Sequence, residues 1–387
     1  MAISVVLQHT VKAFHMSGEY GIFRSLGSYF GVSSFFVLSS FLLTNKLLNS
    51  IDKSNKDNET KEIIVKYLIR RFFRIYVPYL VYCTFVSMNL TISVKYGYKY
   101  EPWYNLVTLK IIGSNHLWTL SPEIKYYLFI PIFTMIASKL QKFNLILILF
   151  IITIMLIVEI FNLFGLKCID IPFPKGQNLF YVFQIFLNGS LLSLVYNELQ
   201  NNSRKFSFVK KINHLSNYFT FAIFFYGLKL SSKFFNRNSS LCHFKYSIYW
   251  SFFILHLIFA ESNHFTDFIN LPILKNFGKY SFGIYLYHYE GFRVINFLKS
   301  NNYISNSNIE IIIIELFVSY FYGMIFFYLI EQSSMNFGNY LIKKIYYSTS
   351  SALIQDSIIS ESSSNKVILT NFLIIFYIFL ILFFLFQ

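Results

Sequence analysis

Two ionisable side chains stand inside or beside apolar segments, where an uncompensated charge is energetically costly. Glu123 opens an apolar run that continues to Met135, within the stretch SNHLWTLSPEIKYYLFIP, and His9 lies in the apolar segment at the amino end. An ionisable residue at membrane depth marks a functional site by default, and an imidazole can take up a proton near neutral pH. Each also has a structural interpretation: Glu123 as a helix-start carboxylate facing the positive end of the helix dipole, and His9 as a satisfied core histidine.

Three arginines form a second group at the start of another apolar segment. In YLIRRFFRIYVPYL, Arg70 and Arg74 are four residues apart and share a helix face, while Arg71 points to a neighbouring face. Guanidinium groups bind phosphate oxygens through paired hydrogen bonds, so the cluster can clamp a phosphate-bearing substrate at the membrane surface. The structural alternative is a positively charged anchor on the cytoplasmic side.

The composition indicates which elements must position these residues. Of 387 residues, 55% are hydrophobic, 21% aromatic and only 13% charged, whereas a soluble domain carries roughly a quarter charged residues. We therefore expect an all-α, polytopic transmembrane helical bundle. The net charge of +15 is spread along loops and forms no single stripe, so no nucleic-acid partner is expected. The three cysteines, Cys83, Cys168 and Cys242, have no metal-ligand spacing, and no metal site is predicted.

Apolar segments of spanning or near-spanning length predict about ten to eleven transmembrane helices. They lie near residues 1–16, 29–48, 74–93, 120–138, 143–164, 179–197, 216–231, 246–262, 279–298, 310–330 and 367–386. The longest polar stretches are 49–66 and 331–366. We expect one transmembrane domain over residues 1–345, and a Ser-rich linker with an extra carboxyl-terminal helix over 346–387.

Basic residues are more frequent in the loops that follow even-numbered segments, above all between Lys46 and Arg74. Because lysine and arginine accumulate on the cytoplasmic side, this asymmetry places the amino terminus and the arginine cluster in the cytoplasm. The carboxyl terminus is then expected on the opposite side.

Short motifs follow one another in order along most of the chain. They are His9 near the end of the first apolar segment, FFVLSSFL (Phe35–Leu42), RRFFRIYVP (Arg70–Pro78), LWTLSPEIKYY (Leu117–Tyr127), GKYSFGIYLYH (Gly278–His288) and Glu331. Together they resemble the membrane-bound acyltransferase 3 family, which includes bacterial polysaccharide O-acetyltransferases and the animal nose-resistant-to-fluoxetine group. The resemblance spans most of the chain and implies about ten transmembrane helices.

The chain departs from the family pattern at several positions. Ser40 stands where the family has a glycine, and this predicts a looser or tilted helix contact. Phe282 replaces a tyrosine, and no proline follows Glu331. The family also has an arginine upstream of the histidine that corresponds to His9, at a position before residue 1. Either part of the amino end is missing from the sequence, or the function of that arginine is lost.

The resemblance implies an O-acyltransferase that moves an acyl group, usually acetyl, from acetyl-CoA or a related donor to a hydroxyl of a carbohydrate or lipid-linked acceptor. No permanently bound cofactor is expected, and membrane lipid is the surrounding partner. His9 is predicted to act as general base or transient acyl carrier, oriented by Glu123, while Arg70, Arg71 and Arg74 hold the donor phosphates. Four further residues are expected to line the substrate cavity: Trp118, Tyr127, Ser281 and His288.

Two other classes of protein remain open on the sequence. A transporter or lipid flippase also needs Glu and His residues within the membrane and a cytoplasmic entrance lined by basic residues. Such proteins typically have two related halves with broken helices. No such halves are visible in the sequence. The other alternative is a catalytically inactive relative, which the missing upstream arginine favours.

Overall fold

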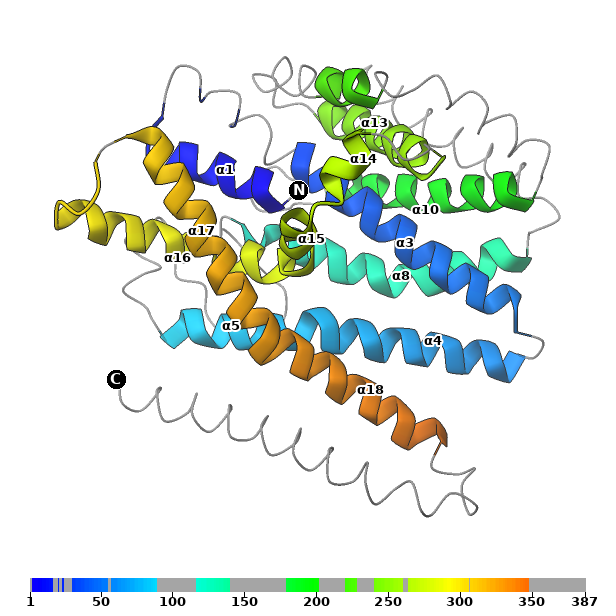
Figure 1. Ribbon diagram of the computed structural model, residues 1–387. Coiled ribbons are helices and arrows are strands. Elements are labelled where there is room, and N and C mark those ends of the chain that lie inside the picture. Colours follow the sequence, from blue (N-terminus) through cyan, green and yellow to red (C-terminus); the bar gives the residue numbers. More distant parts are fainter. Residues whose placement is uncertain are drawn as a thin grey trace. The chain divides into compact units, whose positions relative to one another are not determined.

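The described residues of the computed structural model form helices joined by short turns, and no strand occurs among them (Figure 1). It describes residues 2–16, 20, 23, 30–54, 57–88, 116–139, 179–201, 220–227, 240–259, 264–305 and 307–347. The all-α fold class is therefore confirmed for this part of the chain. The number of membrane-spanning helices and their arrangement as a bundle stay predictions.

The chain divides into two units, and each is described by itself. One unit comprises residues 1–56 and 122–323, and the other comprises 57–121 and 324–387. The first contains all or most of α1 (Ala2–Ala13), α3 (Val32–Asp52), α8 (Leu120–Lys139), α10 (Leu179–Asn201), α13 (Ser240–Phe259), α14 (His264–Ile269), α15 (Pro272–Lys279), α16 (Ser281–Ser300) and α17 (Asn308–Phe326). The second contains α4 (Asp57–Arg71), the π-helical η3 (Phe72–Tyr76), α5 (Val77–Met88), the 3-10 helix η4 (Leu117–Thr119), the π-helical η6 (Phe327–Glu331) and α18 (Gln332–Tyr347).

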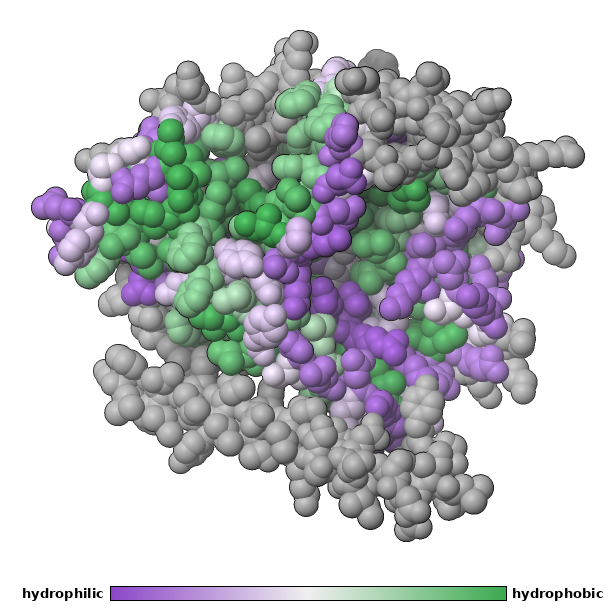
Figure 2. Space-filling view, viewed as in Figure 1, coloured by the Kyte–Doolittle hydropathy of each residue, from purple (hydrophilic) through white to green (hydrophobic). Residues whose placement is uncertain are grey.

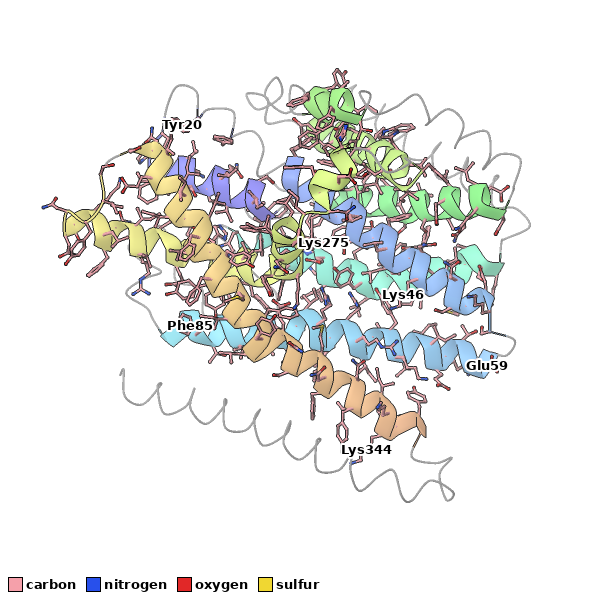
Figure 3. The ribbon with its side chains drawn as sticks, in the orientation of Figure 1. Tyr20, Lys46, Glu59, Phe85, Lys275 and Lys344 are labelled. Carbon is pink, nitrogen blue, oxygen red and sulfur yellow. The ribbon has the colours of Figure 1, made fainter. Side chains whose placement is uncertain are left out.

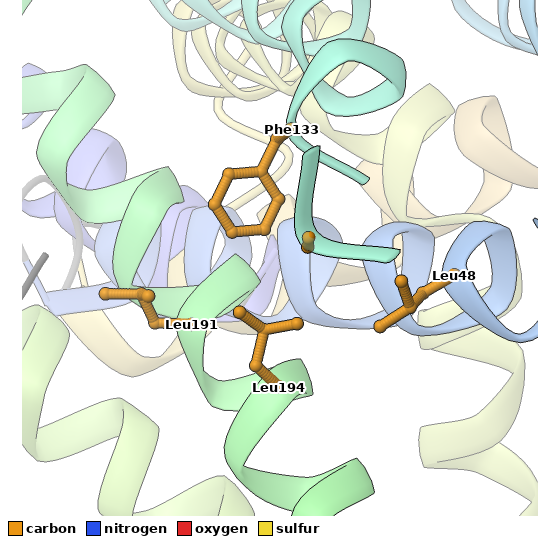
Figure 4. Packing of buried hydrophobic residues seen from close by; sticks show 5 residues of the cluster. Leu48, Phe133, Leu191 and Leu194 are labelled. Atoms are coloured by element: carbon orange, nitrogen blue, oxygen red, sulfur yellow. The ribbon is translucent and has the colours of Figure 1, made fainter. Parts of the chain in front are cut away.

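Helix α10 packs against α3 and α13 at the centre of the first unit. A buried apolar cluster of Leu48, Phe133, Ala137, Leu191 and Leu194 joins α3, α8 and α10. Figure 4 shows Phe133 beside Leu191 and Leu194. Hydroxyl groups connect the same helices, since Ser190 Oγ lies 2.8 Å from Thr44 Oγ1 and 2.7 Å from Tyr126 Oη. An unpaired hydroxyl is costly in apolar surroundings, so these bonds hold the three helices in one register.

The contact between α3 and α10 is close because Gly189 has no side chain. A methyl group at Gly189 would meet Ser40 Oγ and the backbone carbonyl of Val37. Ser40 is fully buried, and its hydroxyl donates to the carbonyl of Phe36 at 2.8 Å. The looser contact predicted from Ser40 is therefore wrong, because a glycine on the opposite helix makes the room that the serine needs.

Helix α16 contacts α1, and α17 crosses it. At the crossing, a Cβ added to Gly283 would lie only 2.8 Å from the carbonyl oxygen of Gly323. Further along, Val11 of α1, Ile295 of α16 and Ile311 of α17 share one buried apolar cluster. These contacts fix the face of α16 that is turned toward α1, and His288 and Tyr289 lie on that face.

In the second unit, α18 packs on α4 and η3, and the two π-helical segments η3 and η6 contact each other. The Lys66 ammonium lies 4.9 Å from the ring centroid of Tyr346, and Figure 3 labels Glu59 and Lys344 on the same two paired helices, α4 and α18. The hydroxyl of Ser334 donates to the carbonyl of Phe73 within η3. Since a π-helical turn disturbs the regular backbone ladder, this side-chain bond supplies a partner for one of its carbonyls.

Large apolar side chains are exposed in rows on the helix surfaces. On α17 they recur every fourth residue, at Ile309, Ile313, Phe317, Phe321 and Ile325. Apolar side chains also gather in Figure 2 where Figure 1 shows α16 and α17. By length and composition, one helix among the described residues is suited to crossing a membrane, the 39-residue helix Asn308–Tyr346.

The polar stretches 49–66 and 331–366 are helical over most of their described residues. Helix α3 continues to Asp52, α4 starts at Asp57, and α18 continues to Tyr347. These polar stretches are helical because side chains pair within and between the helices. Glu62 and Lys66 pair one turn apart, and the ring centroids of Phe337 and Phe73 are 5.4 Å apart.

The predicted segments 143–164 and 367–386, and the linker after residue 347, lie outside the described residues. The predicted domain boundary therefore stays a prediction.

Gly189→Ala should destabilise the folded protein, because the new methyl group meets the backbone of Val37, which cannot rotate away. Overpacking of this kind costs about 1–3 kcal/mol. Thermal unfolding of the detergent-solubilised protein measures the effect as a lower midpoint. Gly278→Ala is the matched control, since an added Cβ meets no heavy atom within 4 Å there. Equal midpoints for the two variants would contradict the close packing of α3 and α10.

Candidate functional site

Two histidines and a tyrosine meet where α1 lies against α16. The rings of His9 and His288 are edge-to-face with centroids 5.1 Å apart, and Tyr289 lies 5.3 Å from His9 and 4.7 Å from His288. The hydroxyl oxygen of Tyr289 is 2.8 Å from His9 Nδ1. Two residues that the sequence singled out separately, His9 and His288, are thus brought together by helix packing.

The two imidazoles differ in what they can reach. His288 is fully buried, and its Nδ1 lies 2.8 Å from the carbonyl oxygen of Tyr285. A carbonyl only accepts hydrogen bonds, so His288 carries its proton on Nδ1. His9 retains partial exposure. Of the pair, His9 is therefore the more exposed ring, and the buried His288 packs against it.

Glu123 belongs to a second polar cluster in the same unit. It lies in the first turn of α8 and is 2% exposed, and the hydroxyl of Tyr127 donates to its Oε1. The Tyr127 hydroxyl oxygen is also 2.8 Å from Ser39 Oγ on α3. The carboxylate of the LWTLSPEIKYY motif is thereby connected through Tyr127 to the serine of the FFVLSSFL motif.

The hydrogen bond and ring contacts of His9 within the described residues go to Tyr289 and His288. Glu123 has Tyr127 as its hydrogen-bond donor. None of these contacts joins His9 to Glu123. The orientation of His9 by Glu123 therefore stays a prediction.

The arginine cluster spans the junction of α4 and η3 in the second unit. Arg70 is exposed, whereas Arg71 and Arg74 are partly buried. Arg74 Nη1 lies 3.2 Å from the sulfur of Met335, a weak acceptor. Burial raises the pKa of Tyr67, one turn before Arg71, and the positive charge of Arg71 opposes that rise. A π-helical segment in this position is typical of functional sites, but the assignment to phosphate binding stays a prediction.

For two other residues, Trp118 and Ser281, a place in the substrate cavity stays a prediction. Trp118 lies in η4 and is partly exposed, and Ser281 is the first residue of α16. Among the described residues, no group of three His, Cys, Asp or Glu side chains is arranged to hold a metal ion.

The sequence interpretation missed Ser39, Tyr289 and Glu315. Glu315 is fully buried in α17, where Ser319 donates to its Oε1 at 2.8 Å, and its Oε2 has no hydrogen-bond partner among the described residues. Gly291 of α16 leaves the room for this carboxyl group. A glutamate inside the run IIIIELFV was a visible signal for it. Ser39 and Tyr289 had no such signal, because hydroxyl residues are common in both segments.

The comparisons with known proteins place the chain by family. A family model described as an acyltransferase domain, that of the acyltransferase 3 family, matches residues 1–330. Comparison with curated proteins and with solved structures gave no match. The match includes the histidine cluster, the Glu123 cluster and the arginine segment, and it covers more than half of the 387 residues. The chain therefore belongs to the acyltransferase 3 family.

Proposed function

We propose that the protein is a multi-pass integral-membrane O-acyltransferase. It moves an acyl group, acetyl in the expected case, from a CoA thioester to a hydroxyl of a carbohydrate or lipid-linked acceptor. The observation that carries the proposal is the setting of His9, a partly exposed imidazole held by a buried histidine and a tyrosine. The family match and the rows of exposed apolar side chains on α17 support the acyltransferase class and the membrane setting.

In this reaction His9 acts as the general base. Its Nε2 takes the proton of the acceptor hydroxyl while the hydroxyl oxygen attacks the thioester carbonyl carbon. The new C–O bond forms, the C–S bond breaks, and His9 returns the proton to the leaving thiolate, so no net proton is consumed. A well-placed base of this kind contributes roughly 10²–10⁴-fold to the rate.

Glu123 acts in the proposal through its hydrogen-bonded neighbours. Its buried carboxylate accepts from Tyr127, whose hydroxyl oxygen also lies against Ser39 Oγ. Such a chain holds its hydroxyl groups in fixed orientations, which suits the binding of a hydroxyl-bearing acceptor.

Arg70, Arg71 and Arg74 bind the donor phosphates in the proposal. Arg70 is exposed and the thioether partner of Arg74 is weak, so their guanidinium groups can exchange present contacts for phosphate oxygens at little cost. The segment lies on the cytoplasmic side, where acyl-CoA is available.

Cysteine labelling tests this topology. In a background without the three native cysteines, Lys56→Cys should react with an impermeant reagent only from the cytoplasmic side, and Ser28→Cys only from the opposite side. Both should react after the membrane is permeabilised. Labelling of Lys56→Cys from the outside alone would reverse the topology and separate the arginines from a cytoplasmic donor.

Arg74→Ala should weaken donor binding by roughly ten- to a hundred-fold, because charge-assisted contacts to phosphate are worth about 1.5–3 kcal/mol each. Isothermal titration of the purified protein with the acyl-CoA donor measures the change. Arg293→Ala is the matched control, since this exposed arginine pairs with Glu290 in the other unit. If Arg74→Ala lowers the amount of inserted protein but leaves donor affinity intact, the cluster is only a topological anchor.

His9→Ala should abolish acyl transfer, a loss of about 10²–10⁴-fold or more, while donor binding stays unchanged. Glu123→Gln should lose most activity because the amide removes the negative charge to which the hydroxyl of Tyr127 donates. If the two act as a unit, the double variant is little worse than either single one. Thioester hydrolysis with and without acceptor is the assay, and His264→Ala, at an exposed histidine of α14, is the control. An active His9→Ala variant would end the mechanism and leave transport or an inactive protein as the function.

A further inference from the structure

We propose that Tyr289 is the positioning residue of His9, an inference that rests on the proposed function. The Tyr289 hydroxyl oxygen lies 2.8 Å from His9 Nδ1, and it is the hydrogen-bond partner of that ring among the described residues. By accepting a hydrogen bond from Nδ1–H, Tyr289 keeps the proton of the neutral ring on Nδ1. The other nitrogen, Nε2, is then free of a proton and can act as the base.

The contact with Tyr289 and the role of His9 as a base together select the tautomer. A tyrosine hydroxyl both donates and accepts, so it is compatible with either tautomer of His9. Only the Nδ1–H tautomer leaves a basic nitrogen away from Tyr289. The alternative tautomer carries its proton on Nε2 and spends its lone pair on the tyrosine, and it cannot accept the proton of an attacking hydroxyl.

Tyr289 is itself held firmly enough to orient another side chain. Its ring packs against His288 at 4.7 Å and Phe292 at 5.1 Å between centroids. Phe292 in turn contacts Phe14, the residue that follows the end of α1, edge-to-face at 5.7 Å. These ring contacts restrict the rotation of the Tyr289 side chain, so its hydroxyl stays within reach of His9 Nδ1.

Tyr289 takes the place that the carboxylate has in a hydrolase triad, because it accepts a hydrogen bond from Nδ1–H of the catalytic histidine. Unlike the carboxylate, its hydroxyl group is neutral. A neutral acceptor stabilises the imidazolium less than a carboxylate does, so its main contribution is the selection of tautomer and ring orientation. Tyr289 does not touch the substrate in this scheme.

Tyr289→Phe tests the role because it keeps the ring contacts and removes only the hydroxyl. The variant should lower kcat by roughly ten- to a hundred-fold, as expected for the loss of one buried hydrogen bond to a catalytic group, with an unchanged KM for the donor. Tyr287→Phe is the matched control. It also removes one tyrosine hydroxyl of α16, but its ring stacks on Tyr322 of α17, at 6.1 Å between centroids, instead of His9.

Nitrogen-15 NMR of the histidine-labelled protein provides a readout independent of activity. The His9 signals are those that disappear in His9→Gln, among the eight histidines of the chain. Wild-type protein should show His9 protonated on Nδ1 alone, and Tyr289→Phe should show a mixture of tautomers. A wild-type His9 protonated on Nε2, or wild-type kcat in Tyr289→Phe beside an inactive His9→Ala, overturns the positioning role alone. An active His9→Ala variant overturns the proposed function together with it.

Discussion

Polar groups enclosed by apolar helices must be satisfied by one another, and this constraint shapes the described parts of the protein. Several hydroxyls bond back to a carbonyl of their own helix, as Thr10 does with Val6 and Thr134 with Ile130. Others form bonds between helices, as Ser190 does with Thr44 and Tyr126. Each bond between helices fixes the rotation of one helix against its neighbour. The face of α8 that carries Glu123 is oriented by the same bonds.

Glycines complement these bonds by allowing helices to approach closely. Gly189 admits the backbone of α3, and Gly283 meets Gly323 where α17 crosses α16. Dispersion contacts increase at such crossings, and they stabilise helix pairs even where lipid removes the hydrophobic driving force. Gly291 uses the same lack of a side chain differently, since the space is filled by the carboxyl group of Glu315.

The helical fold class could be predicted from composition, and apolar segments such as 29–48 and 120–138 coincide with α3 and α8. The polar helix α4 could not, because its stability comes from side-chain pairs and from packing against α18, which hydropathy does not record. Motif order was enough to nominate His9 and Glu123 as candidates. Their partners depend on rotation of helices distant in sequence: Tyr289 is 280 residues from His9, and Ser39 is 88 residues from Tyr127.

The π-helical segments also affect how substitutions and length changes should be interpreted. A π-helical turn contains one more residue than an α-helical turn, so side chains on either side of η3 follow different helical phases. A single-residue deletion within Phe72–Tyr76 would restore α-helical phase and rotate α5 relative to α4 by roughly 100°. Phe327–Glu331 is a second π-helical segment of the same unit, directly before α18. A relative that has one residue fewer in such a π-helical segment would therefore have the following helix rotated. The same motif residues would then lie on a different face of that helix.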